Sequence, residues 1–375
     1  MQQKGLNSEI TVGSKRLHVQ TSFLQSSSKI ISNVFDDGRV VEAREQNLIK
    51  SQVNGHLDQH IQDVHQQIVA DIELLFAMAK KVESVRHAVS CAKIGSVFLS
   101  KGFLDEAIHF FNLTLAVEQN NAEAYKNLGI CYMKKRHYEK AEVAFSQALN
   151  YATDYADIIL KLGLLFLEKK DYVRAFELFE KCLTINPSFF AAHVQICRTL
   201  LMTINTQQES PGLPSTPNRI KLIEKHIDEA CRALKAFDFK TTHQARTALL
   251  AGDFDKASEL LENAYEQAQP ALDLTFEHEF YLKFMYGGKG KDDVFIEQYI
   301  GRLNQAVEDQ PGYADLHNNL GIAYLILCRN LFLKALDEFR KALGINPNFK
   351  RAKKNLRLAE NDGKGFLILL RALLK

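Results

Sequence analysis

The sequence predicts a mainly α-helical protein in which helical hairpins stack into an α-solenoid, preceded by a small antiparallel β segment and a linking helix. The main observation is a pattern of small and aromatic residues that recurs every 34 residues over three consecutive units. A unit of this length holds two helices and a turn, and it buries its apolar face only against a neighbouring unit. A second observation is an Asp-Gly turn between two β-rich runs near the N-terminus, which is a strong hairpin signal.

Composition narrows the function classes. The chain has 47 Lys and Arg residues against 45 acidic residues, and this balance gives no electrostatic reason to expect nucleic acid as a partner. Its six cysteines are widely spaced and form no Cys-x-x-Cys pair, so neither a zinc ribbon nor a disulfide framework is expected. The N-terminus has no apolar signal-peptide core, and no stretch approaches the ~20 apolar residues that span a bilayer. We therefore expect a cytoplasmic protein without an integral membrane segment.

Three sets of positions carry the repeat, each spaced by 34 residues. They are the glycines Gly95, Gly129 and Gly163, the alanines Ala107, Ala141 and Ala175, and the phenylalanines Phe111, Phe145 and Phe179. The small residues allow two helices to cross closely, and the aromatic rings fill the space between a hairpin and the next unit. Pro187 closes the third unit because proline lacks an N–H and cannot continue the helical pattern.

This pattern resembles the tetratricopeptide repeat (TPR) family in its period and in the order of its small, aromatic and proline positions. The resemblance implies a right-handed superhelix whose first helices line a concave groove. The clear units are 88–121, 122–155 and 156–189, and a fourth begins at Phe190 with Cys197 in the place of the glycine. We therefore expect a TPR array over residues 88–204.

The pattern weakens after this array. Three prolines within residues 211–217 predict a linker loop over 205–218, which would leave the two flanking arms some freedom. Degenerate repeats with a capping helix are expected over 219–360. There, Leu320-Gly321-Ile322-Ala323-Tyr324 resembles Leu128-Gly129-Ile130-Cys131-Tyr132, which predicts a final hairpin with a longer turn. Residues 361–375 form an apolar tail that we expect to dock as a helix on the last repeat or on a partner.

The first 50 residues predict a sheet of three or four short strands. Asp36-Asp37-Gly38 marks one hairpin, and Gly13-Ser14 marks a second. Such a small sheet is only marginally stable by itself, so it should pack on another element.

Residues 51–87 contain the expected linking helix, from Leu57 to Val85. Its apolar residues follow one another at steps of three and four, a coiled-coil rhythm with one stutter. We favour an amphipathic helix packed on the sheet and on the first repeat; the alternative is a homodimer through the same face. His56, His60 and His65 lack the glutamate of a metalloprotease motif and are expected on a solvated face, so no metal site is predicted.

The TPR resemblance implies a peptide-binding groove lined by particular positions of each unit. The candidate groove residues are Lys93, Ser96, Lys126, Asn127, Ile130, Lys134, Leu160, Lys161, Leu164, Asn318 and Asn319. An asparagine amide can bond both backbone groups of a bound peptide. The leading hypothesis is a non-catalytic scaffold without a cofactor, which binds other proteins or peptide segments and assembles a multi-protein complex.

Two other functions remain open. One is a ligand-responsive regulatory protein that uses its N-terminal β segment, and the other is an accessory subunit of a separate enzyme. A receptor for chaperone tails is disfavoured. Asn127 and Lys161 match two positions of the carboxylate clamp that the family resemblance implies, whereas Ala92, Ser96 and Asp157 break the other three.

Overall fold

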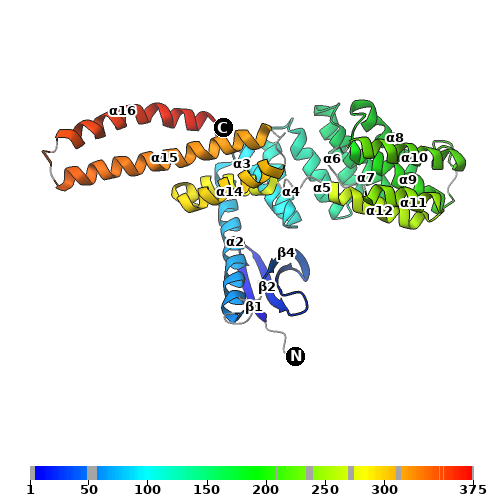
Figure 1. Ribbon diagram of the computed structural model, residues 1–375, viewed down its shortest axis with the longest axis horizontal. Coiled ribbons are helices and arrows are strands. Elements are labelled where there is room, and N and C mark those ends of the chain that lie inside the picture. Colours follow the sequence, from blue (N-terminus) through cyan, green and yellow to red (C-terminus); the bar gives the residue numbers. More distant parts are fainter. Residues whose placement is uncertain are drawn as a thin grey trace. The chain divides into compact units, whose positions relative to one another are not determined.

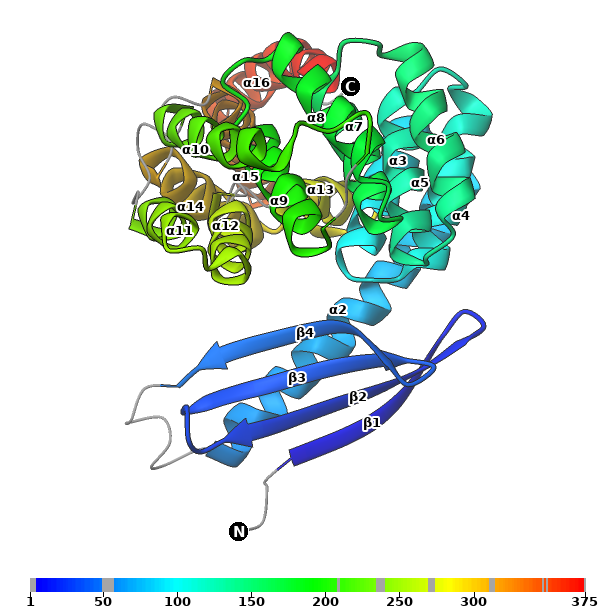
Figure 2. The ribbon, with the colours of Figure 1, turned by 90° about the vertical axis from the view of Figure 1, so that its right-hand side faces the viewer.

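The computed structural model describes most of the chain as a small β-sheet followed by helices (Figures 1 and 2). The described residues are 5–48, 57–207, 210–233, 240–268, 274–309, 314–345, 347–348 and 350–373. The chain divides into two compact units, Met1–Glu279 and Phe280–Lys375.

The N-terminal sheet is antiparallel throughout, with its strands in chain order. Its strands are β1 (Gly5–Val12), β2 (Lys15–Leu24), β3 (Lys29–Asp36) and β4 (Arg39–Asn47). Asp37 and Gly38 both have positive φ, 47° and 77°, as the tight turn between β3 and β4 requires. The first hairpin turns at Gly13, whose φ is 62°. The predicted antiparallel sheet is therefore confirmed, with four strands.

The linking helix α2 (Leu57–Val85) packs across one face of this sheet (Figure 2). Ile61, Ile68 and Ile72 are buried on the helix, opposite Leu17 and Val19 of the sheet interior. The packing on the sheet is thus as predicted. The apolar face that would form a homodimeric coiled coil is already covered within one chain, so it is not free for a second copy.

His65 departs from the sequence-based expectation of a solvated face. Its ring lies between α2 and the sheet, with Nε2 2.9 Å from Ser8 Oγ and Nδ1 2.9 Å from Thr21 Oγ1. Thr21 Oγ1 lies 2.8 Å from Ser32 Oγ, and burial lowers the pKa of His65. The buried polar groups therefore satisfy one another. His56 lies outside the described residues.

Three helical hairpins follow and confirm the repeat. They are α3 (Ala88–Ser100) with α4 (Leu104–Val117), α5 (Ala122–Lys134) with α6 (Tyr138–Tyr151), and α7 (Ala156–Glu168) with α8 (Tyr172–Ile185). Each pair is joined by a three-residue turn whose middle residue has positive φ, namely Gly102, Arg136 and Lys170. This shared backbone conformation reverses the chain at the same point in every unit.

The repeating glycines lie where the two helices of each hairpin meet. A Cβ atom added to Gly129 would lie 2.5 Å from Cε1 of the Phe145 ring, which is closer than real Cβ contacts come. The same contact relates the other repeats. The corresponding distances are 2.9 Å for Gly95 with Phe111 and 2.5 Å for Gly163 with Phe179. Glycine and phenylalanine, sixteen residues apart in each unit, are therefore two halves of one contact.

The first compact unit continues with two more hairpins. They are α9 (Phe190–Asn205) with α10 (Thr216–Ala233), and α11 (Lys240–Leu250) with α12 (Phe254–Ala268). Cys197 takes the place of the glycine, and its thiol donates to the Ile223 carbonyl oxygen at 3.6 Å. The turn before α12 uses Gly252, whose φ is 74°.

The proline-rich loop between α9 and α10 is anchored, in contrast to the expected free linker. Leu213 is buried in the main core, and Arg219 is fully buried with its Nε donating to the Pro214 carbonyl at 2.7 Å. A Cβ on Gly212 would lie 2.4 Å from a methyl group of Val173 on α8. The division between the compact units falls at Glu279 instead.

The second unit departs most from the predicted hairpins. It contains the end of α13 (Leu274–Met285), η1 (Lys289–Lys291), α14 (Asp293–Asp309), α15 (Ala314–Ile345) and α16 (Lys350–Leu373). The Phe280 ring stacks on Tyr299 with centroids 3.7 Å apart, which ties α13 to α14. Helix α16 runs on through residues 361–373, where the sequence predicted a separate tail.

The predicted last hairpin is one continuous 32-residue helix, α15, so that prediction was wrong. The expected turn region, Leu327 to Lys334, contains neither glycine nor proline and is rich in leucine, which favours uninterrupted helix. A Cβ added to Gly321, the counterpart of Gly129, would meet no atom of the described residues within 4 Å. The helix-crossing contact that defines the earlier units is therefore missing at this position.

The sequence predicted no stretch long and apolar enough to span a bilayer, and helix α15 differs from that expectation. Its most apolar 18-residue window has a mean hydropathy of 1.3 and is 22% buried, so its length and composition would allow it to cross a membrane. Two polar residues of this helix bond Asp293 of α14. Asn330 donates to it at 3.0 Å, and Lys334 forms an ion pair with it.

A buried histidine pair joins α9 to α10. The Nδ1 atoms of His193 and His226 lie 2.8 Å apart, and His193 Nε2 lies 2.9 Å from the Pro187 carbonyl oxygen. A carbonyl oxygen only accepts hydrogen bonds, so Nε2 of His193 carries the proton and donates it to Pro187. In a neutral ring the other nitrogen, Nδ1, then accepts a hydrogen bond from Nδ1 of His226. Burial, followed by the charge of His193 and of Lys225, lowers the pKa of His226 to about 4. Both rings are therefore neutral in the folded protein at pH 7.

Acidification should destabilise the protein through this pair. Because folding lowers the pKa of His226, the unfolded chain binds more protons below its ordinary value of about 6.5. The stabilisation is complete above that pH and is lost as the pH falls toward about 4. When the pH falls from 7 to 5, we expect protonation of His226 in the unfolded chain to lower the free energy of unfolding by about 2 kcal/mol. Urea unfolding of His226→Gln should show a correspondingly smaller pH dependence, and the exposed His243→Gln should match wild type.

The glycine–phenylalanine contact predicts opposite effects of one substitution at two places. Gly129→Ala should lower the free energy of unfolding by about 1–3 kcal/mol, because the new methyl group overpacks against Phe145. Gly321→Ala should raise helix stability by up to about 1 kcal/mol, because its position is open and alanine favours helix. Urea unfolding followed by circular dichroism checks both. Equal effects of the two substitutions would contradict this account of the hairpin.

Candidate functional site

The predicted groove residues of the first three repeats lie on neighbouring first helices. Helices α3, α5, α7 and α9 contact one another in that order. Most of the predicted positions are half-buried, as expected for a lined concave surface. These are Lys93, Ser96, Lys126, Asn127, Ile130, Lys161 and Leu164, whereas Lys134 is exposed. With Leu160, which also lies on α7, the structure therefore brings nine of the predicted positions onto one run of adjacent helices.

A polar network links α5 to α7 along this run. The Lys126 amine bonds Glu123 at 2.6 Å and Asp157 at 3.0 Å, and Asn127 donates to Glu123 at 3.3 Å. Burial acts to lower the pKa of Lys126, but the two carboxylates raise it overall. Lys126 is thus a charged, fixed bridge between two repeats.

Lys161 on α7 has a different environment. Burial lowers its pKa, the charges of Lys126 and Lys134 add to this effect, and Asp157 opposes it. Among the residues that the structure describes, none bonds the Lys161 amine. A half-buried ammonium without a bonded carboxylate is a costly arrangement, and an incoming anionic group would relieve it.

The remaining polar positions are partly engaged. Burial lowers the pKa of Lys93, and the charge of Glu277 on α13 opposes that effect. The Ser96 hydroxyl donates at 3.0 Å to the Ala92 carbonyl of its own helix. Ser96 is therefore a weaker candidate for ligand contact than Lys161.

The apolar floor of the predicted groove would consist of its three apolar positions, Ile130, Leu160 and Leu164, but one of them is buried. Ile130 and Leu164 are half-buried and pack against the main core, so part of each side chain remains accessible. Leu160 is only 3% exposed and belongs to the core itself. Helix α7 is apolar on nearly all sides, and a helix of that kind is buried on most of its surface. Leu160 is therefore removed from the groove.

Asn318 and Asn319 are the candidate groove residues of the last predicted unit. They lie in the second compact unit, on the continuous helix α15 rather than on the first helix of a hairpin. Asn318 is exposed and Asn319 is half-buried. The hairpin geometry on which their assignment rested is not formed there.

Sequence reasoning missed a cavity that forms where the sheet meets the first repeat. A cavity of about 710 Å³ is lined by the β1–β2 turn and by residues of α2, α3 and α4. Its lining combines the β1–β2 turn, near residue 13, with helices over residues 73–110, and these two parts are distant in the chain, so no local motif could have revealed it. Within the described part of the chain, no group of three His, Cys, Asp or Glu side chains is placed to hold a metal ion.

Comparison with known proteins supports the repeat architecture. Two family models, both described as tetratricopeptide repeat, match residues 122–155 and 156–189, the hairpins α5–α6 and α7–α8. No curated protein matches the chain significantly.

Similar solved structures include three helical-repeat proteins. MamA is 21% identical, with a TM-score of 0.38 over 45% of this chain and 95% of that one. A tetratricopeptide repeat protein from Parabacteroides merdae is 19% identical, with a TM-score of 0.35 over 73% and 98%. PilF of Pseudomonas aeruginosa is 12% identical, with a TM-score of 0.37 over 61% and 95%.

Proposed function

We propose that this chain, a member of the tetratricopeptide-repeat family, is a non-catalytic scaffold that binds partner proteins along α3, α5 and α7. A partner segment would lie across the groove and contact several repeats at once. Binding of such segments would bring other proteins together into one complex. The repeats supply a protein-interaction surface in general, and the groove side chains suggest which segments suit it.

The half-buried Lys161 ammonium carries this proposal. It is held near Lys126, which is neutralised by Glu123 and Asp157, while Lys161 itself has no bonded carboxylate among the described residues. A carboxylate from a bound protein segment would pair with the Lys161 ammonium. A hydrogen bond to a charged group contributes about 1.5–3 kcal/mol. The ligand expected is therefore a segment with an acidic residue.

Ile130 and Leu164 supply the second half of the recognition. They are half-buried on α5 and α7, the helices that also carry Lys126 and Lys161. An apolar anchor of the partner would cover their accessible surface, and such anchors normally dominate affinity. We therefore propose a partner segment in which apolar anchors flank an acidic residue.

Peptides selected from a random display library against the intact chain provide a direct test of groove binding. The double variant Asn127→Ala, Leu164→Glu should bind selected peptides at least about tenfold more weakly, because it removes an amide and places a charge on the apolar floor. A matched control is Val143→Glu on the outer helix α6, where Val143 is 61% exposed. This control should bind like wild type.

Circular dichroism must show that both variants keep their helices. Unchanged affinity of the folded double variant would rule out the groove as the binding surface. Loss of affinity in Val143→Glu would place binding on the outer face instead.

Lys161 allows stability and binding to be separated. Lys161→Met should leave the free energy of unfolding unchanged or raise it, because it removes a charge that burial penalises. The same change should weaken binding of acidic selected peptides about tenfold, through loss of one charged hydrogen bond. Urea unfolding and isothermal titration calorimetry measure the two quantities. If Lys161→Met lowers stability while binding is unchanged, Lys161 has a structural role only.

A further inference from the structure

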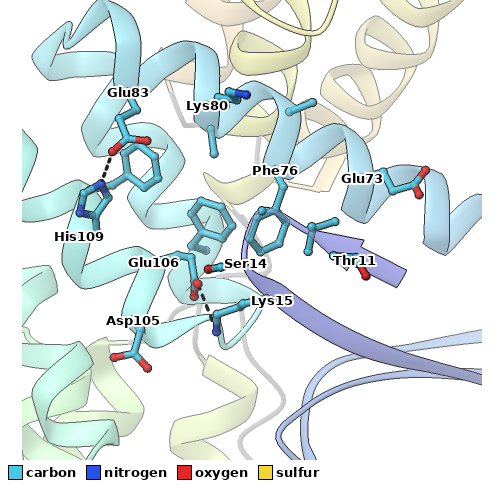
Figure 3. A pocket seen from close by; sticks show the side chains of 16 residues that line it. Thr11, Ser14, Lys15, Glu73, Phe76, Lys80, Glu83, Asp105, Glu106 and His109 are labelled. Atoms are coloured by element: carbon cyan, nitrogen blue, oxygen red, sulfur yellow. Dashed lines mark hydrogen bonds and ion pairs between the residues drawn. The ribbon is translucent and has the colours of Figure 1, made fainter. Parts of the chain in front are cut away.

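The cavity between the sheet and the first repeat has a lining unlike that of the groove. Thr11 and Ser14 line it beside the β1–β2 turn, Phe76 lines it from α2, and His109 and Phe110 line it from α4 (Figure 3). Its volume of about 710 Å³ falls within the range of small-ligand sites, about 300–1,000 Å³. It contains none of the predicted groove residues, so a ligand here would be independent of the groove.

Acidic side chains outnumber basic ones in this lining. Four carboxylates, from Glu73, Glu83, Asp105 and Glu106, face two amines, from Lys15 and Lys80. Some of these charges are already paired. Lys15 bonds Asp36 and, at 3.2 Å, Glu106; Asp105 forms an ion pair with Lys135; and Glu83 accepts from His109 at 2.9 Å.

The Glu106 carboxylate is incompletely satisfied. One of its oxygens faces Lys15, as Figure 3 shows, while Oε2 is buried and has no hydrogen-bond partner among the residues that the structure describes. A buried acceptor without a donor costs about 1–3 kcal/mol, more when the group is charged. The Glu106 side chain is 18% exposed, so a ligand that donates to this carboxylate after the group rotates would recover that cost. A cationic donor would also balance the excess of carboxylates.

Aromatic rings complete the lining. The Phe76 and Phe110 rings border the cavity, and Phe98 packs behind both, with ring centroids 5.2 Å and 5.7 Å away. The face of an aromatic ring attracts a cation, and this attraction strengthens as the cation loses water. A buried carboxylate beside aromatic rings suits a group that is both cationic and only weakly hydrated.

From these observations we propose that the cavity binds a guanidinium or ammonium group, with guanidinium preferred. The planar guanidinium group would donate to Glu106 and stack on Phe76, which is half-buried, whereas the Phe110 ring is only 4% exposed. Glu73 and Glu83, at the exposed ends of the lining, would attract the cation toward the cavity. Glu73 and Glu83 are separated by ten residues of α2, about 15 Å along its axis. The bound group is either part of a small molecule or the side chain of an arginine in a partner protein.

Isothermal titration calorimetry on the full chain tests this proposal with N-acetylarginine amide and its uncharged counterpart, N-acetylcitrulline amide. The arginine compound should bind and the citrulline compound should not. Glu106→Gln and Glu83→Gln should each weaken arginine binding, the first by about tenfold through loss of one charged hydrogen bond. Glu139→Gln, an exposed residue of α6 outside the cavity, serves as the matched control and should bind like wild type.

A serine-flanked pentapeptide with a central arginine separates the two sources of the cation. Tighter binding of the peptide than of the amide identifies a partner's side chain, and equal binding identifies a small molecule. Both variants should keep wild-type affinity for the selected groove peptides, which excludes general unfolding. Equal binding of the arginine and citrulline compounds, no binding of either, or wild-type affinity in both Glu variants would overturn the proposal.

Discussion

The contact between a glycine and a phenyl ring within each hairpin is the constraint on which the array depends. Gly129 allows the Phe145 ring to approach to a distance that a single methyl group would block. The ring is fully buried there and holds the two helices together. Because the same contact recurs in three units, their first helices follow one another in a regular order, and the proposed groove depends on that order. Where the contact is missing, at Gly321, the chain continues as one helix.

The candidate groove combines a rigid apolar support with an unbalanced charge. Helix α7 buries most of its surface, so the residues that remain accessible on it are few and well positioned. Lys126 is neutralised by carboxylates of two repeats, whereas Lys161 is held half-buried beside it without one. A charge kept in this state lowers the stability of the fold, and the carboxylate of the proposed partner would offset that cost.

The N-terminal sheet has a structural and a chemical consequence. It covers the apolar face of α2, which removes the surface that would otherwise pair with a second copy. It also brings the β1–β2 turn against the first repeat, where Lys15 reaches Glu106 on α4. The cavity at this junction therefore exists only because a sheet, a linking helix and a repeat meet.

Local patterns in the sequence determined the helical hairpins of residues 88–189, the Asp37-Gly38 turn and the helix from Leu57 to Val85, because each depends on residues that are close in the chain. Through the repeat register they also placed Lys126 and Lys161 on the first helices of neighbouring repeats, α5 and α7, along which we propose the groove. Only the tertiary structure decided the burial of Leu160 and His65, the continuity of α15, and the cavity beside Glu106. Those features depend on which side chains from distant segments pack together, and a single sequence carries no local signal of such contacts.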